Sequence, residues 1–232
     1  MATLNQIAND ILTAVRPQLS DDSELDIRQI KFWIKNQRSV LIRNEINRNR
    51  TIDSDITQTL CVELECVDAS DCCDIKLGDK ILRSTKEIPE TLEMHNKKAI
   101  TRIGPVNKKK ESFNLVDYER VPFVTEARFT GNMVFAFMHD KYLYIYSKNP
   151  RYRDMEAASL RGVFEDPEIA KRFKSCDDIT VPCYSDDSPY PIKTWMIPSM
   201  KQVILQQLGA VSQAEIQLAD DSNNAKSDPA QQ

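Results

Sequence analysis

Four of the six cysteines, Cys61, Cys66, Cys72 and Cys73, lie within thirteen residues of one another. Thiolates gathered in this way could hold a zinc ion, but zinc sites favour closely spaced cysteine pairs matched by a second pair or by histidines. The spacing here fits that pattern poorly, and adjacent cysteines rarely point at one metal. We therefore favour ordinary reduced, buried thiols. A structural zinc site and a disulfide formed outside the reducing cytosol are the alternatives.

The two histidines, His95 and His139, are the only imidazoles that could serve a nucleophile. Neither lies next to a nucleophile elbow or a recognisable partner residue, so hydrolase chemistry is disfavoured. The five glycines are too scattered to build a phosphate-binding loop. Nucleotide chemistry is therefore disfavoured as well.

Acidic doublets occur at Asp21–Asp22, Asp177–Asp178 and Asp186–Asp187. Two-metal nucleases need carboxylates that converge from different elements. These doublets instead sit beside Ser, Pro and Tyr, where capping and turn formation explain them more simply. We expect no catalytic residue, no cofactor and no metal, and hence a protein that is not an enzyme.

A basic stripe lies on the predicted helix over residues 23–48. Its members are spaced by three or four residues and share one side of the helix: Arg28, Lys31, Lys35 and Arg38. The stripe is either a solvated helix face or a contact with an acidic partner surface or with phosphates. The chain carries a formal net charge of −4 and no nucleic-acid-binding motif, so sequence-specific DNA binding is disfavoured.

Residues 132–147 predict a β-hairpin with a tight connection. Tyr142, Tyr144 and Tyr146 share one face of the second arm because side chains alternate along a strand. Both faces carry apolar bulk, which favours a packed hairpin covered on both sides. The alternative is an aromatic wall that touches a partner.

Three segments show one apolar stripe each at helical spacing: 3–15, which opens with a capping box at Thr3, then 23–48 and 192–208. Pro198 lies inside the last segment, so that helix should kink or begin near it. Because each helix can bury only one stripe, the three should pack on each other. No apolar run approaches the roughly 18 residues needed to cross a bilayer, so no membrane partner is expected.

Short strand candidates fill the middle of the chain, at Thr59–Val67, Ala99–Ile103 and Val116–Val124. Pro122 makes the last of these an edge strand. Residues 159–164 are predicted as a short extended or turn segment, and Asp166 and Pro167 open a short helix.

We therefore predict an α+β fold: a helical bundle built from the N- and C-terminal helices, with an inserted small β domain and a disordered polar C-terminal tail. The discontinuous helical base comprises residues 1–50 and 150–210, the inserted β domain 51–149, and the flexible tail 211–232.

The sequence resembles virion structural proteins of crAss-like bacteriophages. The stretches that carry the resemblance are Asp26–Ile34 followed by Arg38 and Arg43, Ile100–Val106, Arg161–Pro167, Asp187–Met196, and the doublet Cys72–Cys73. The Arg-Gly-Val-Phe-Glu-Asp-Pro string at 161–167 is the most specific of these, and none of them is catalytic.

The resemblance implies a head–tail connector protein, a ring or adaptor in the portal–tail neck of a short-tailed phage. Similar connectors assemble as closed rings of about twelve copies around the DNA channel. The implied partners are further copies of the chain, the portal protein, other neck or tail ring proteins, tail fibres, and genomic DNA that passes without sequence-specific binding. The implied location is the virion, assembled in the cytoplasm of the infected bacterium.

Two sets of residues become expected contact sites under this resemblance. The expected subunit or portal interface comprises Arg28, Lys31, Lys35, Arg38, Trp195, Met196 and Met200. The expected outer or neighbour contact comprises Tyr142, Tyr144 and Tyr146. The competing hypotheses are another virion component, such as a tail-fibre attachment or minor capsid protein, and a DNA-binding regulator or enzyme of the infected cell.

Overall fold

The computed structural model describes residues 2–16, 25–49, 51–68, 80–95, 98–107, 110–126, 130, 133–173, 176 and 185–209. The chain divides into two compact units. The first combines residues up to Glu45 with those from Ser185 onward, and the second runs from Ile46 to Tyr184. The polar tail expected at 211–232 lies outside the described residues.

The first unit begins with helix α1 (Leu4–Val15). The Thr3 hydroxyl oxygen accepts a hydrogen bond from the Gln6 backbone N–H at 3.2 Å, and the Gln6 side chain accepts from the Thr3 N–H at 3.1 Å. The predicted capping box is therefore confirmed. The predicted apolar stripe is also confirmed, because its residues are buried: Leu4, Ile7, Ala8, Ile11 and Val15.

The same unit contains helix α2 (Ile27–Asn49) up to Glu45, and a helix over residues 196–209. The latter begins late, as Pro198 predicted, and this proline lies in its first turn, where a missing N–H costs little. The segment before it lies against the N-terminus. The Tyr190 N–H donates to the Ala2 carbonyl at 3.0 Å, and Asn5 Nδ2 donates to Asp187 Oδ1 at 2.8 Å.

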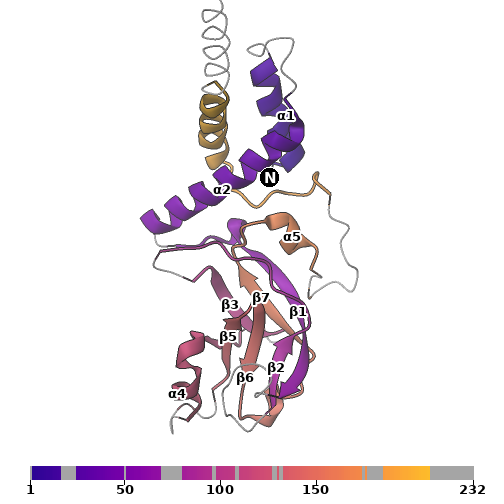
Figure 1. Ribbon diagram of the computed structural model, residues 1–232, viewed down its shortest axis with the longest axis vertical. Coiled ribbons are helices and arrows are strands. Elements are labelled where there is room, and N and C mark those ends of the chain that lie inside the picture. The colour runs from indigo at the N-terminus through magenta and orange to yellow at the C-terminus, as the bar shows by residue number, and fades with distance from the viewer. Residues whose placement is uncertain are drawn as a thin grey trace, which may run out of the picture. The chain divides into compact units, whose positions relative to one another are not determined.

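The second unit is built on one seven-stranded sheet with the order β3-β7-β1-β2-β6-β5-β4. Its strands are β1 (Gln58–Asp68), β2 (Lys80–Ser84), β3 (Ile100–Pro105), β4 (Asn114–Leu115), β5 (Phe135–His139), β6 (Tyr142–Tyr146) and β7 (Ala157–Gly162). Figure 1 shows these strands curving around a common interior.

The two ends of the sheet almost meet. The Phe113 N–H donates to the Ile103 carbonyl at 2.7 Å, which links β3 to the segment that leads into β4. Arg102 Nη2 also donates to the Glu111 carbonyl at 2.9 Å. The sheet is therefore a nearly closed, barrel-like structure. Closure of this kind removes open strand edges, which would otherwise pair with other chains.

Two cores fill the two faces of the sheet. One cluster includes Leu60, Ile103, Leu143 and Phe164, and α5 (Pro167–Lys171) contributes Ala170 to it. The other face is covered by η3 (Tyr118–Arg120) and α4 (Val121–Glu126), which lies beside β5 in Figure 1. Both faces of the sheet are therefore packed.

The β5–β6 hairpin confirms the prediction for residues 132–147. Its two connecting residues, Asp140 and Lys141, have φ values of 47° and 67°. Positive φ at both positions is the mark of a type I′ turn, whose twist matches that of antiparallel strands. In the ladder, Phe137 lies opposite Tyr144 and His139 lies opposite Tyr142.

The predicted fold class was wrong in its architecture. The chain is not a helical bundle with a small β insertion, but a mixed α+β protein whose sheet has seven strands and is almost closed. One strand, β7, lies between β1 and β3 in the sheet. The sequence predicted only a short extended or turn segment over residues 159–164, which include part of this strand. The sheet is therefore larger than the strand candidates indicated.

The strand predicted at Val116–Val124 was also wrong. These residues form η3 and α4 instead. Pro122 is the second residue of α4, a position where its missing N–H and fixed φ are tolerated. Pro122, which predicted an edge strand, therefore lies in the first turn of a helix.

The seam between β3 and β4 generates a stability prediction. A Cβ added at Gly104 would overlap the Glu111 carbonyl oxygen, whereas one added at Gly209 meets nothing within 4 Å. We expect Gly104→Ala to lower the free energy of unfolding by about 1–3 kcal/mol through local overpacking. The matched control, Gly209→Ala, should be neutral or slightly stabilising because alanine favours a helix. Urea unfolding measures both, and equal effects would contradict a tightly packed seam.

Candidate assembly surfaces

Helix α2 presents an exposed row of side chains at four-residue spacing. Its members are Arg28, Phe32, Asn36, Val40, Asn44 and Arg48, and we call them the outer row of α2. Phe32 is 60% exposed and Val40 is 45% exposed. Residues four apart are neighbours on a helix surface, so the row is continuous over about 30 Å. Phe32 and Val40 are thus two exposed apolar groups on this row, each flanked by polar residues.

The opposite side of α2 is buried within the first unit. Arg38 is fully buried there, and its Nε donates to the Pro191 carbonyl at 2.9 Å. Its guanidinium carbon lies 5.7 Å from the centroid of the Tyr190 ring, a cation–π distance. Lys31 pairs with Asp186 in the same segment. Two members of the predicted basic stripe thus bind their own chain.

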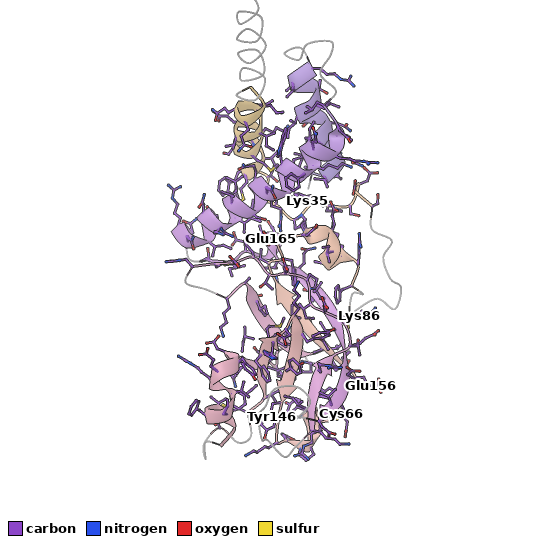
Figure 2. The ribbon with its side chains drawn as sticks, viewed as in Figure 1. Lys35, Cys66, Lys86, Tyr146, Glu156 and Glu165 are labelled. Atoms are coloured by element: carbon purple, nitrogen blue, oxygen red, sulfur yellow. The ribbon has the colours of Figure 1, made fainter. Side chains whose placement is uncertain are left out.

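The other two members differ in exposure. Lys35 is half-buried on α2 (Figure 2), whereas Arg28 is exposed at the start of the outer row. The Arg28 backbone N–H donates to Asp26 Oδ1 at 3.0 Å, a contact at the helix start that does not involve the guanidinium. A role for the stripe in contacting another subunit stays a prediction.

The three residues near the C-terminal helix that were predicted at an interface also differ in burial. Met196 and Met200 are buried in the first unit, and Trp195 is 56% exposed. Lys193 Nζ lies 5.8 Å from the centroid of the Trp195 ring and 3.6 Å from Glu45 Oε1. The indole is therefore held near α2 by a cation that also pairs with that helix.

The three hairpin tyrosines lie on the face covered by η3 and α4. Tyr144 and Tyr146 are buried, and Tyr142 is half-buried. Tyr144 stacks on Phe137 with ring centroids 5.3 Å apart, and His139 stacks on Tyr118 at 4.2 Å. Figure 2 labels Tyr146 among the side chains of the sheet. In the single chain, the Tyr144 and Tyr146 rings belong to a core.

A groove of about 450 Å³ lies in the second unit, where the chain after β2 passes the β5–β6 turn. We call it the acidic groove. Its apolar lining comes from Ile88, Pro89 and Met138, and its charged lining from Glu90, Glu93, Asp140, Glu165 and Lys141. Glu165 is labelled in Figure 2. This surface could not be predicted from the sequence, because its residues come from three distant stretches of the chain.

Carboxylates dominate the electrostatics of the acidic groove. Lys141 Nζ pairs with Glu90 Oε1 at 3.0 Å. The hydrogen bond from Lys141 to Glu90, together with the charges of Glu90 and Glu87, raises the pKa of the Lys141 ammonium. Even with this ammonium counted, the described lining residues carry an excess of negative charge. The groove is thus suited to a cationic partner.

The cysteines do not assemble into a site within the described residues. Cys61 and Cys176 are half-buried, and Cys66 is exposed. Cys72, Cys73 and Cys183 lie outside the described residues. No group of three or more potential metal ligands occurs in the part of the chain that the structure describes.

No helix in the described part of the chain is long and apolar enough to cross a membrane.

A family model described as phage tail ring protein 2, from crAss-like phages, matches residues 6–229. The chain belongs to this family. No curated protein matches it. The resemblance to crAss-like phage structural proteins is thereby confirmed, and the chain is a phage tail ring protein and a virion component with a structural role. Such a protein needs surfaces that contact other tail components.

The buried arginine of this tail ring protein generates the second prediction. Arg38→Met retains most of the side-chain volume but removes the donor to the buried Pro191 carbonyl. We expect a loss of about 1–3 kcal/mol in the free energy of unfolding. Arg28→Met, on the exposed outer row, should change it by less than about 0.5 kcal/mol. An unchanged stability for Arg38→Met would show that Arg38 contributes by packing alone.

The hairpin of the tail ring protein generates the third prediction. Tyr144→Ala removes a buried ring that stacks on Phe137, and it should cost about 3–5 kcal/mol of stability. Tyr142→Ala, on the same face but half-buried, should cost less. Thermal unfolding compares the two. A stable Tyr144→Ala protein that fails to enter particles would identify this face as an interface instead.

Proposed function

We propose that the chain forms a closed ring in the head–tail connector, beneath the portal and around the DNA channel, and that it has no enzymatic activity. The ring would contain about twelve copies. The observation that carries the proposal is the family match, which spans residues 6–229 of a chain of 232. Assembly in the cytoplasm of the infected bacterium is part of the same proposal.

The surface chemistry supports a ring. Closed rings use head-to-tail interfaces, in which two different surfaces of one chain meet. Two dissimilar surfaces are available among the described residues: the outer row of α2, where Phe32 and Val40 alternate with arginines and asparagines, and the acidic groove on the second unit. A structural ring protein needs surfaces of this kind, and it needs no active site.

The charge of the chain supports passage of DNA. Each copy has a formal net charge of −4, so about twelve copies carry about −48. A net-negative wall repels the phosphate backbone, which lets DNA slide through without adhering. Genomic DNA is therefore a passing partner in this proposal, with no sequence-specific contact.

The proposed protein partners are the portal protein, other neck or tail ring proteins, and tail fibres. Among the residues predicted at a subunit or portal interface, Arg28 and Trp195 are exposed, and we propose them as contact residues. Lys31, Arg38, Met196 and Met200 would act indirectly, by holding the first unit together.

The fourth prediction concerns the place of the chain in the particle. A reconstruction of the virion, with cyclic symmetry applied along the tail axis, should show copies of this chain closed into a ring between the portal and the tail. A ring elsewhere in the tail would retain the ring function and contradict the neck position. Density for the chain at the fibres or in the capsid shell would contradict the ring itself.

A further inference from the structure

The outer row of α2 exposes apolar side chains on a helix that also has a buried apolar side. An amphipathic helix normally turns its apolar residues to the core, and α2 does so on its other side through Ile30, Ile34 and Ile42. Phe32 and Val40 nevertheless remain exposed between polar residues. Arg28 lies one turn before Phe32, so a ring and a cation stand side by side on this surface.

The acidic groove offers the complementary chemistry. Ile88, Pro89 and Met138 give it an apolar lining, while Glu93 and Glu165 are exposed acids at its edge. Its volume of about 450 Å³ falls in the range that proteins use to hold a small-molecule-sized group. It is therefore large enough for one or two side chains of a helix, but not for the helix itself.

We propose that Phe32 and Arg28 of one copy enter the acidic groove of the next copy, and that this contact is the repeating interface of the ring. The inference rests on the ring function proposed above. Burial of the Phe32 ring against the apolar lining would supply affinity, since apolar area removed from water is the main driving force in association. Arg28 would meet the carboxylates, which sets orientation and speeds encounter.

The charges of these two surfaces disfavour other partners for the acidic groove and the outer row of α2. DNA would be attracted by Arg28 but repelled by the carboxylates of the groove, so it cannot join the two surfaces. Another tail protein could cover either surface alone. A second copy of the chain is the occupant that satisfies both surfaces at once, and it does so in the head-to-tail manner that a closed ring requires.

Charge reversal in two separate chains tests the contact directly. One chain carries Arg28→Glu, which makes its helix surface acidic, and the other carries Glu93→Arg with Glu165→Arg, which makes its groove basic. Sedimentation equilibrium of the full-length chains at low salt measures association. Either variant alone should associate at least tenfold more weakly than the unaltered chain, because like charges then face each other. An equimolar mixture should recover association, since each altered surface finds an opposite charge on the other chain.

Phe32→Ala tests the apolar part of the same contact. An anchor residue at the centre of an interface should cost about thirtyfold in the dissociation constant when it is truncated. The matched control is Phe123→Ala on α4, which removes another exposed ring that is 77% exposed and lies outside both surfaces. For the charge variants, the control is Asp154→Arg with Glu156→Arg, two exposed acids outside the groove.

A photo-crosslinking residue placed at position 32 identifies the occupant even where association is weak. Copies labelled with ¹⁵N are mixed with unlabelled copies, and the crosslinked peptides are identified by mass. Products between differently labelled chains that map to residues 88–94, 138–141 or 165 support the proposal. Products within one chain, products that map elsewhere, or no product at any protein concentration would overturn it. So would a mixture of the two charge variants that fails to recover association.

The two proposals fail in different ways. A reconstruction that shows a ring whose neighbouring copies meet through other surfaces would overturn this contact and leave the ring function intact. A reconstruction without a ring would overturn the function itself, whatever the crosslinks show.

Discussion

The pairing of β1 with β7 is the constraint on which the second unit depends. The two strands are joined along six residue pairs, from Gln58 opposite Gly162 to Glu63 opposite Ala157, although β1 ends at Asp68 and β7 begins only at Ala157. β7 then pairs with β3 on its other edge, and β3 reaches the segment before β4 through the Phe113–Ile103 hydrogen bond. Without β7, β3 would lose its partner strand, and the two ends of the sheet could not approach each other.

The same closure positions the acidic groove. The chain leaves β2 and runs past the β5–β6 turn, where the Ile88 N–H donates to the Lys141 carbonyl at 2.8 Å. It then meets the end of β7, where the Leu92 N–H donates to the Val163 carbonyl and the Glu165 N–H donates to the Glu90 carbonyl, each at 3.0 Å. These backbone bonds bring three distant carboxylate-bearing stretches together. A groove made in this way is a property of the closed sheet and not of any one segment.

Local features of the fold could be predicted from the sequence, and non-local ones could not. The capping box at Thr3 and the tight hairpin depend on residues close in the chain, so their patterns were sufficient. β7 begins Ala157-Ala158-Ser159, which has little intrinsic strand preference, and it becomes a strand because β1 and β3 pair with both of its edges. Arg38 looked like a surface cation, but the segment at Pro191 returns to cover it, and no periodicity in α2 carries that information.

The distribution of charge on α2 follows from this long-range packing, and it bears on how such a chain can assemble. Lys31 and Arg38 are held by Asp186 and the Pro191 carbonyl, so two of the four cations of the predicted basic stripe are matched by their own chain. The surface left for partners is the outer row, where Phe32 and Val40 lie among a few polar groups. Covering a surface that has few charges costs little desolvation free energy. A single arginine beside an apolar ring then directs this surface to an acidic site in preference to other apolar sites. In this way the intramolecular ion pair and hydrogen bond of the first unit would determine which part of α2 is available for a ring contact.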